Sequence, residues 1–370
     1  MATTSDILVI GGGIAGLSAA AALSGHAKVT VLEAEEQVGF HSSGRSATML
    51  HYFLGDRLVR ELTLASRGFI ENPPESFTDA ALGHSMPVLV YAREDEREAL
   101  ETLDAEISQF AELDRLDPDG VHELCPLLKG DAVLGLVDRS AIRLDPHALL
   151  QGNLRQLRHS DGALVTGTRV ASIQRTGGSW EITTKRGDAY SAPILVNAAG
   201  SWADKIAELA GVRPVGLQPL RRTIITFDPP PGTNLDGLPF AKTIYDELYF
   251  APESGRLFAS PMDEVTSEPC DAQPDDYEVA LAAWRMEERT TVKVEHIHSK
   301  WAGLRTFAPD RHPVVGFAPD ADCFFWLAGQ GGFGLQTSPA IAAIVASLIA
   351  GTPWPVAEIR AEELRADRFG

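Results

Sequence analysis

One stretch near the N-terminus combines glycines and an acid at a spacing that suits a phosphate-containing ligand. An apolar strand at residues 7–10 is followed by a G-x-G-x-x-G turn, a small Ala-rich helix and a second strand that ends at Glu33. Gly11 permits the tight turn, Gly13 lets backbone N–H groups approach a pyrophosphate, and Gly16 lets helix and strand pack closely. An acid 20 residues beyond Gly13 accepts hydrogen bonds from a ribose 2′-hydroxyl and repels a 2′-phosphate. The pattern therefore predicts a site for FAD or NAD rather than NADP.

A polar loop at residues 37–47 follows directly from the strand that carries the acid. Because of this position, we expect the loop to run beside the cofactor. Ser42, Ser43 and Arg45 can offer two hydroxyls and a guanidinium to a diphosphate.

A second glycine-rich turn, at residues 329–336, begins about 315 residues beyond the first. It joins an apolar strand at 324–328 to an apolar helix at 338–349. The N-terminus of this helix can therefore face the other end of a long cofactor.

The composition is that of a soluble globular protein with an acidic surface. The chain has 370 residues, of which 44% are hydrophobic and 22% charged, and its formal net charge is −19. Such a surface repels phosphate backbones and anionic lipid, so we expect no nucleic-acid partner. The three cysteines are scattered, and neither a signal peptide nor a membrane-spanning run is evident. We therefore expect no disulfide, no metal site, no integral membrane segment and a cytoplasmic location.

Hydrophobic periodicity predicts an α/β fold with two sheet systems. Amphipathic or apolar helices are expected at residues 56–70, 95–113 and 201–209. Strands are expected at 87–92, 163–165, 169–175, 180–184, 194–197, 214–227 and 240–260. We predict a Rossmann-like FAD-binding domain at residues 1–80, 143–212 and 300–370, with an inserted mixed or antiparallel β-sheet substrate domain at residues 81–142 and 213–299.

Five motifs in this order resemble the D-amino acid oxidase superfamily of FAD-dependent oxidoreductases, in particular bacterial D-amino acid dehydrogenases of the D-arginine dehydrogenase type. The motifs are ILVIGGGIAGLSAA, GFHSSGRSA, ILVNAAGSWADKIAELAGVRPVGLQPLRR, KWAGLRTFAPD and FFWLAGQGGFGLQTSPA. They extend over nearly the whole chain. The resemblance implies a D-amino acid oxidase-like fold and bound FAD. The absence of a cysteine at residues 312–317 argues for a non-covalent flavin.

The resemblance also implies which residues hold FAD. The ADP half would lie against the first glycine turn, the adenine against the backbone of Val170, and the isoalloxazine near the second glycine turn. The expected cofactor-binding residues are Gly11, Gly13, Ile14, Ala15, Gly16, Glu33, Ala34, Ser42, Ser43, Arg45, Ser46, Ala47, Val170, Ala199, Gly200, Trp202, Gly303, Arg305, Gly331, Gly332, Gly334, Leu335 and Gln336.

Four positions match the residues that hold the substrate in the family. Arg305, Tyr249 and Arg222 would bind the substrate's carboxylate, and the backbone carbonyl of Gly332 would receive its amine. A guanidinium beside the flavin can bind a carboxylate bidentately and so direct the Cα–H toward flavin N5. Alternatively, either arginine pairs with one of the chain's many acids as a structural ion pair.

The side-chain pocket departs from the D-arginine dehydrogenase pattern. The acid that holds a guanidinium there aligns with Pro87, and two lid residues align with Leu54 and Met49, with His51 close by. Preference for a cationic side chain should therefore fall. Alternation along a strand places Phe240 and Lys242 on one face. Lys242 either favours a side-chain carboxylate, as in D-glutamate or D-aspartate, or snorkels to solvent, in which case an apolar or aromatic D-amino acid stacks on Phe240. Leu335 and Gln336 complete the expected pocket.

The predicted function is FAD-dependent oxidative deamination of D-amino acids to 2-oxo acids and ammonia, by hydride transfer from Cα to flavin N5. The electrons would pass to a quinone-like acceptor. An oxidase that makes hydrogen peroxide from a D-amino acid, glycine or an N-methylated amino acid is the nearest alternative. A 2-hydroxy acid dehydrogenase and a non-catalytic FAD-binding assembly factor are further alternatives. No oligomeric state is predicted.

Overall fold

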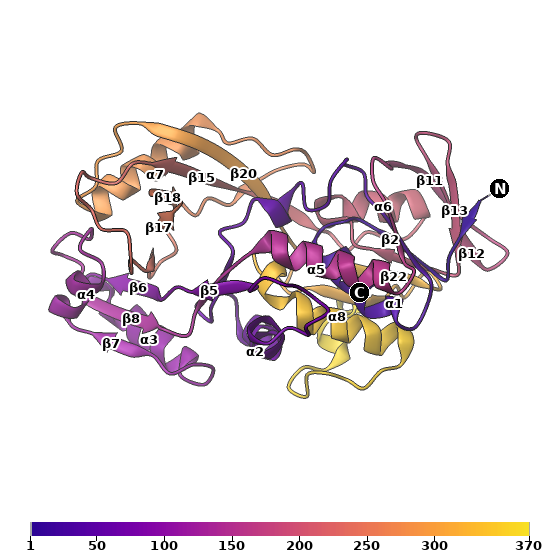
Figure 1. The fold of residues 1–370 in the computed structure, drawn as a ribbon, viewed down its shortest axis with the longest axis horizontal. Coiled ribbons are helices and arrows are strands. Elements are labelled where there is room, and N and C mark those ends of the chain that lie inside the picture. The colour runs from indigo at the N-terminus through magenta and orange to yellow at the C-terminus, as the bar shows by residue number, and fades with distance from the viewer. Residues whose placement is uncertain (1, 370) are drawn as a thin grey trace.

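A computed structural model of the chain describes residues 2–369. Two β-sheet systems lie toward opposite ends of an elongated molecule, with helices between and around them (Figure 1). The fold is α/β, as predicted from the sequence, with a Rossmann-like sheet joined to a large mixed sheet. Among the described residues, no helix is long and apolar enough to cross a bilayer.

The Rossmann-like sheet has six strands in the order β10-β3-β2-β14-β22-β21. All neighbours are parallel except the pair β21 and β22. Its strands are almost wholly apolar because both faces are covered. Their bounds are β2 (Ile7–Ile10), β3 (Val29–Leu32), β10 (Ala163–Val165), β14 (Ile194–Asn197), β21 (Val314–Phe317) and β22 (Phe324–Ala328).

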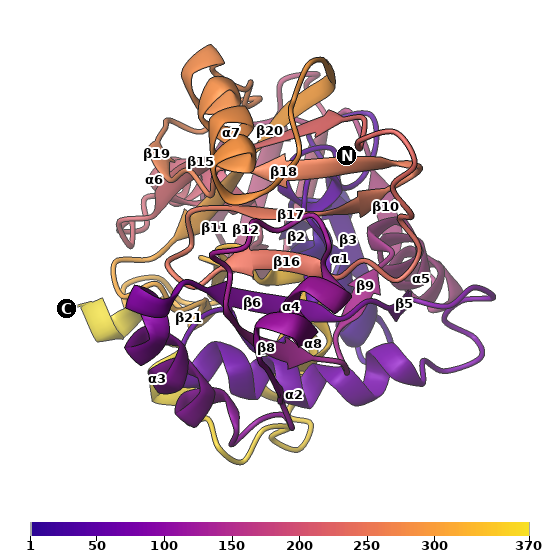
Figure 2. The same cartoon turned by 90° about the vertical axis from the view of Figure 1, so that its left-hand side faces the viewer.

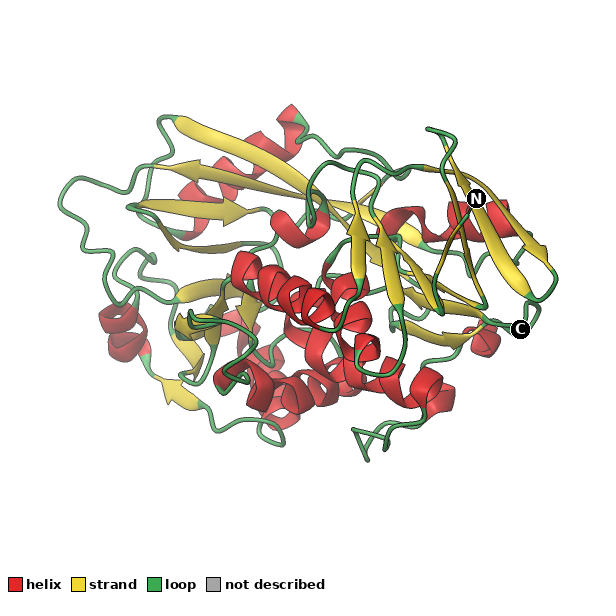
Figure 3. Ribbon diagram, turned by 45° about the vertical axis from the view of Figure 1, so that its right-hand side comes forward, coloured by secondary structure: helices red, strands yellow, loops and turns green. Residues whose placement is uncertain are grey.

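Alternate residues of β2 enter two different cores. Ile7 and Val9 pack in a core under the helices of one face, whereas Leu8 and Ile10 pack in a core under the other face. Figure 3 shows the helices of the first face as a group of red coils beside the strands. These helices are α1 (Ile14–Ser24), α2 (Arg57–Glu71), α5 (Pro146–His159) and α8 (Gly334–Ala350).

The second face is covered by a four-stranded sheet and a short helix. The sheet has the order β1-β13-β12-β11, and β1 extends it in parallel with β13. The elements are β1 (Thr3–Thr4), β11 (Val170–Thr176), β12 (Ser179–Thr184), β13 (Ala189–Ala192), η3 (Gly200–Trp202) and α6 (Ala203–Ala210).

The large sheet has nine strands, and Figure 2 shows most of them stacked one above another. Its path is β19-β15-β18-β17-β16-β6-β8-β7, and β20 pairs with β15. Only β6 and β16 are parallel neighbours. The strands are β6 (Val88–Ala92), β7 (Asp114–Leu116), β8 (Leu134–Asp138), β15 (Gln218–Phe227), β16 (Phe240–Thr243), β17 (Tyr249–Glu253), β18 (Arg256–Ser260), β19 (Val265–Thr266) and β20 (Ile297–Phe307).

Short elements complete the architecture. A three-stranded sheet in the order β4-β9-β5 is built from segments on either side of β6 and β8. The large sheet carries helices α3, α4 and α7. The remaining bounds are η1 (Ser42–Gly44), β4 (Met49–Leu50), β5 (Gly83–Ser85), η2 (Glu94–Glu96), α3 (Arg97–Ile107), α4 (Pro118–Leu124), β9 (Ile142–Leu144), α7 (Asp276–Arg289), η4 (Ala361–Glu363) and η5 (Ala366–Phe369).

Several element boundaries differ from those predicted. The helix expected at 95–113 ends at Ile107, and the helix expected from residue 338 already begins at Gly334. Strand β20 pairs with β15 along its length, so residues 300–307 lie in the large sheet, across the domain boundary predicted at residue 300. The division into two domains otherwise stays a prediction, and its end residues 1 and 370 lie outside the described residues.

Candidate functional site

Three adjoining pockets form one elongated cavity at the carboxyl ends of the parallel strands. The loops that follow β2, β3, β14 and β22 all contribute to its wall, which is the usual place for ligands in open α/β sheets. The first two pockets share Gly13, Ser42, Ser43, Ala198, Gly200 and Ser201. The first and third share Ser46, Ala47, Tyr249, Arg305, Gly332 and Leu335. The cavity therefore runs from the first glycine turn to the large sheet.

Two glycines of the first turn, Gly11 and Gly16, have no room for a side chain. A Cβ atom on Gly16 would lie 1.9 Å from the carbonyl oxygen of Gly11, and one on Gly11 would lie 2.3 Å from the carbonyl oxygen of Ala198. Gly11 also has a φ of +112°, which L side chains rarely adopt. Gly16 does not line the cavity, so it serves the close packing of α1 rather than ligand contact.

Glu33 lies at the end of β3 on the wall of the cavity, as predicted. One carboxylate oxygen accepts a hydrogen bond from the backbone N–H of Gly12 at 2.5 Å, and the other accepts from the N–H of Glu35 at 2.8 Å. These bonds fix the carboxylate at the edge of the glycine turn, where it can accept from a ribose hydroxyl.

The loop at residues 37–47 crosses the middle of the cavity. The Ser43 hydroxyl accepts from the N–H of Ile14 at 3.0 Å, at the N-terminus of α1, and the Ser42 hydroxyl donates to the carbonyl of Leu304 at 2.6 Å. Ser46 and Ala47 continue the wall toward the large sheet. Both predicted serines therefore face the region where the diphosphate was expected.

Arg45 lines the cavity, as expected, but the protein itself engages several of its donors. Its guanidinium donates to the carbonyls of Ala272 at 3.1 Å and Ala302 at 3.2 Å, and pairs with Asp271 at 2.6 Å. These bonds fasten the loop to the large-sheet segment, and Nε donates to the carbonyl of Phe40 within the loop at 3.2 Å, so the contact of Arg45 with a diphosphate stays a prediction.

The far end of the cavity, beside the four-stranded sheet, contains Val170, Ala199 and Trp202 as expected. The sequence analysis missed His41, whose ring centroid lies 4.7 Å from that of Trp202. It also missed three cations on this wall, Arg169, Lys185 and Lys205. His41 and Lys205 were within quoted motifs, whereas nothing in the local sequence marks Arg169 and Lys185.

Arg305 lies where the cavity meets the large sheet. Among the residues that the structure describes, 2–369, no carboxylate forms an ion pair with its guanidinium. Burial, and then the neighbouring Arg222 charge, lower the pKa of this guanidinium to about 10, which leaves it charged at neutral pH. The structural ion pair considered for Arg305 is therefore absent from the described residues, and the guanidinium is available to an anion.

Arg222, Tyr249 and Gly332 surround this guanidinium on the cavity wall. Arg222 is buried, donates to the carbonyl of Asp263 at 2.8 Å and lies 3.5 Å from a Glu264 oxygen, so it does have a structural partner. Its Nη1 atom is nevertheless buried without a described hydrogen-bond partner. A Cβ on Gly332 would lie 2.7 Å from the central carbon of the Arg305 guanidinium, so glycine leaves room for that group.

The third pocket brings together the predicted side-chain residues. Met49, His51, Leu54, Phe240, Lys242, Leu335 and Gln336 all line it. Pro87 does not line it; its carbonyl accepts from the N–H of Phe240 at 2.9 Å, at the junction of β6 and β16. Met262, Thr48 and Ser46 also line it; none of the three was predicted for this pocket, and Ser46 was expected only beside the cofactor.

The position of Lys242 excludes one of the two roles that the sequence predicted for this residue. Only 3% of the residue is exposed, and its ammonium pairs with Asp246 in the turn between β16 and β17. The expectation that Lys242 snorkels to solvent is therefore wrong. The pairing could not be predicted because it depends on the shape of this turn.

The fold and the cavity define a class of protein, a dinucleotide-binding protein with two arginines, Arg222 and Arg305, at one end of its cavity. The family model described as DAO, FAD dependent oxidoreductase, matches residues 6–348, and the chain belongs to this family. Glycine oxidase of Bacillus licheniformis is 27% identical over 369 residues, covering 94% of each chain.

Two solved structures show the same fold. L-alpha-glycerophosphate oxidase from Mycoplasma pneumoniae with FAD bound has a TM-score of 0.84 at 19% identity, covering 94% of this chain and 95% of its own. L-proline dehydrogenase from P. horikoshii has a TM-score of 0.84 at 22% identity, covering 100% of this chain and 98% of its own.

The cofactor of this FAD-dependent oxidoreductase is FAD, and the cavity fits it. Gly11 and Gly13 let backbone approach a pyrophosphate, Glu33 can bind a ribose, and the N-terminus of α1 faces the diphosphate region. The N-terminal turn of α8 lies near Arg305, where the isoalloxazine was expected. These roles for single residues remain proposals.

Proposed function

We propose that the protein oxidises D-amino acids to 2-oxo acids and ammonia and passes the electrons to a quinone-like acceptor. The observation that carries this proposal is the Arg305 guanidinium, which has no described anionic partner and lies on the cavity wall between the cofactor region and the side-chain pocket. A guanidinium in this position needs an anion, and the α-carboxylate of an amino acid supplies one.

The surrounding residues would orient the substrate. Arg305 binds the carboxylate bidentately, the Tyr249 hydroxyl adds a neutral hydrogen bond, and the unpartnered Nη1 of Arg222 supplies a further donor. The carbonyl of Gly332 accepts from the substrate amine. When bound, FAD, held non-covalently, supplies the acceptor for the hydride that leaves Cα. The imino acid released then takes up water to give the 2-oxo acid and ammonia.

No side chain of the pocket needs to act as a strong base in this scheme. His51, which lines the third pocket, is a candidate base. Burial, followed by the charges of Lys242 and Arg305, lowers the pKa of its ring to about 3. The ring is therefore neutral and weakly basic at neutral pH. The pocket residues bind and orient the substrate and keep water away.

Substitution of Arg305 by Met tests the proposal. We expect FAD to remain bound, measured by its visible absorbance, while kcat/KM for the best D-amino acid falls by about a thousandfold or more, because a buried carboxylate loses its charged partner. Arg221→Met is the matched control: Arg221 is the neighbour of Arg222 on β15 and pairs with Glu278 of α7 at 3.0 Å. Turnover by Arg305→Met within a few-fold of the wild type would contradict the proposed clamp.

An oxygen-using oxidase is the second candidate, and the similarity to the glycine oxidase of Bacillus licheniformis favours it. Both candidates use the same carboxylate clamp and differ in the electron acceptor. Oxygen consumption and peroxide formation during turnover separate them: the dehydrogenase requires an added quinone for turnover, whereas the oxidase does not.

A further inference from the structure

The pocket beyond Arg305 contains two buried nitrogen donors, Lys242 and His51, in a wall that also includes Ser46, Thr48, Tyr249 and Gln336. Lys242 and His51 are buried, with exposed fractions of 3% and 1%, and both line the pocket together with Met49, Leu54 and Phe240. Buried polar groups normally have hydrogen-bond partners, so the donors they have left over indicate what the pocket receives.

Lys242 has donors to spare. Its ammonium pairs with Asp246 and lies 3.5 Å from the carbonyl of Phe53, the limit of hydrogen-bond distance. An ammonium has three N–H donors, so at least one is left for a group in the pocket. The Asp246 side chain is 57% exposed, which places much of the balancing charge on the solvent side of the pair.

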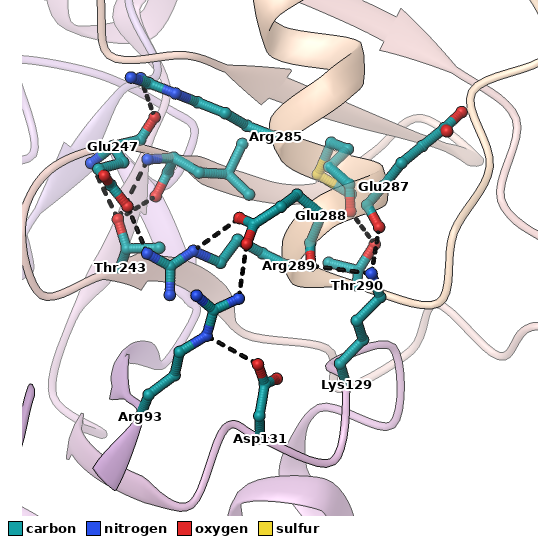
Figure 4. Close-up of polar contacts among 12 residues, drawn as sticks. Arg93, Lys129, Asp131, Thr243, Glu247, Arg285, Glu287, Glu288, Arg289 and Thr290 are labelled. Carbon is teal, nitrogen blue, oxygen red and sulfur yellow. Dashed lines mark hydrogen bonds and ion pairs between the residues drawn. The ribbon is translucent and has the colours of Figure 1, made fainter. Parts of the chain in front are cut away.

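The turn that carries Asp246 is held independently of any ligand. The Thr243 hydroxyl accepts from the N–H groups of Glu247 at 2.9 Å and Leu248 at 3.1 Å. Arg285 donates to the backbone carbonyl of Glu247 at 2.5 Å, and Arg289 forms an ion pair with the Glu247 carboxylate. Figure 4 shows both contacts. The position of the Lys242 ammonium beside the pocket is therefore built into the fold.

His51 is a second donor. Its Nδ1 atom accepts the backbone N–H of Phe53 at 3.2 Å. The ring is neutral at working pH because burial, Lys242 and Arg305 all disfavour the imidazolium. With Nδ1 acting as an acceptor, the ring proton resides on Nε2, and no described residue of the chain accepts it.

These donors select among the side chains considered for the substrate. A cationic side chain would meet Lys242 and Arg305, and among the described residues no carboxylate lines this pocket to offset the repulsion. An apolar side chain would cover Lys242 and His51 without giving their free donors a partner, which is unfavourable in a buried site. One face of the Phe240 ring is already stacked on Tyr249, with centroids 5.0 Å apart.

Building on the proposed function, we infer that the substrate is an acidic D-amino acid of the D-glutamate or D-aspartate class. Its α-carboxylate lies on Arg305, and its side-chain carboxylate accepts from the Lys242 ammonium and from Nε2–H of His51. One carboxylate would balance the charge of Arg305, and the other would share the Lys242 ammonium with Asp246, in a protein of net charge −19.

Binding of unreactive acids to the FAD-loaded protein tests the inference without turnover. Glutarate carries two carboxylates and pentanoate one, at equal carbon number. We expect the wild type to bind glutarate at least about tenfold more tightly than pentanoate, measured by calorimetry and by perturbation of the flavin spectrum. Lys242→Met should remove this preference, whereas Lys300→Met, on the exposed part of β20, should keep it.

Substitution of Asp246 tests the inference by an expected gain, rather than a loss, of glutarate affinity. Asp246→Asn leaves the Lys242 ammonium without its carboxylate, so glutarate should bind several-fold more tightly while pentanoate binding stays unchanged. A misfolded variant cannot give tighter binding. The double variant Lys242→Met with Asp246→Asn removes both charges and should again bind the two acids alike, which excludes repulsion by an unpaired Asp246 as the cause.

The outcomes separate this inference from the proposed function. Equal affinity of the wild type for glutarate and pentanoate, with rapid flavin reduction by apolar D-amino acids, would overturn the inference and leave the proposed function standing. A Lys242-dependent preference for glutarate in a protein that no D-amino acid reduces would support the two-carboxylate pocket and overturn the proposed function.

Discussion

The two ends of the cavity are built in different ways. The end that would hold the ADP half has at its centre glycines, small residues and Glu33, which follow parallel strands of a single sheet, and Glu35 and three cations also line it. The end beyond Arg305 is made mainly of larger side chains, two of them charged (Arg305 and Lys242), from β16, β17, β20 and the loop after β4. The backbone of the glycine turn shapes the first end, and the identity of the side chains shapes the second.

This difference has consequences for specificity. A backbone cradle recognises a pyrophosphate in any protein that forms the turn, so it serves a shared cofactor. The side-chain end can change its ligand by single substitutions, because Arg305 has no ion-pair partner among the described residues and Lys242 has only Asp246 and the carbonyl of Phe53. Substitutions at the first end should therefore affect folding and FAD together, and those at the second end should affect substrate alone.

The largest effect is expected at the backbone end. Gly16→Ala should destabilise the protein by about 3 kcal/mol or more and abolish FAD binding, because its Cβ would overlap the carbonyl of Gly11. Gly25→Ala, at the C-terminus of the same helix, is the control: it meets nothing within 4 Å, and we expect a change within about 0.5 kcal/mol. The FAD content and the thermal melting temperature of both variants test this prediction. A normal FAD content in Gly16→Ala would contradict the role proposed for the close packing of the glycine turn.

A smaller and more selective effect is expected at Gly332. An Ala side chain there would displace the Arg305 guanidinium, whose central carbon lies 2.7 Å from the added Cβ. Affinity for carboxylates should fall about tenfold or more, while FAD content stays at the wild-type level. Titration with pentanoate and the visible spectrum measure the two properties. Loss of FAD together with the carboxylate would mean that the two ends are not independent.

The smallest effect concerns pH. The pKa of His51 falls from 6.5 to about 3 on folding, so between these values the unfolded chain binds a proton that the folded protein does not. Stability should therefore decline as pH falls from 6.5 toward 3, and the charges facing the ring, Lys242 and Arg305, both act in this direction.

His51→Gln should make that decline less steep, because the amide has no proton to take up in the unfolded chain. Thermal melting as a function of pH measures the slope. His26→Gln, at an exposed position, should leave the slope as in the wild type. Equal slopes for His51→Gln and the wild type would show that the ring is not held neutral by burial.

Sequence reasoning was most successful where local pattern decides structure. The strands at 163–165, 194–197 and 324–328 were predicted with their observed bounds, and the first glycine turn stands where its spacing placed it. Helix α5 was missed although Asp145 and Pro146 form a typical start, with the Asp145 carboxylate accepting from the N–H of Ala148 at 2.9 Å.

The charged residues were harder to predict because their partners are distant in the sequence or depend on a turn. Arg45 is held by Asp271 and Ala272, and Lys242 by the turn after β16. The tautomer of His51 depends on the path of the backbone at Phe53. Residue type suggested each as a candidate, but only the tertiary structure shows which donors are left for a ligand.

The most direct measurement is the visible spectrum of the purified FAD-loaded protein, with oxygen excluded, after separate additions of D-glutamate, D-aspartate, apolar D-amino acids, their L-enantiomers and 2-hydroxy acids. We predict that D-amino acids bleach the oxidised-flavin band, that acidic ones do so fastest, and that the L-enantiomers leave it unchanged. A yellow protein that no D-amino acid bleaches, or one bleached only by 2-hydroxy acids, would contradict the proposed oxidation of D-amino acids.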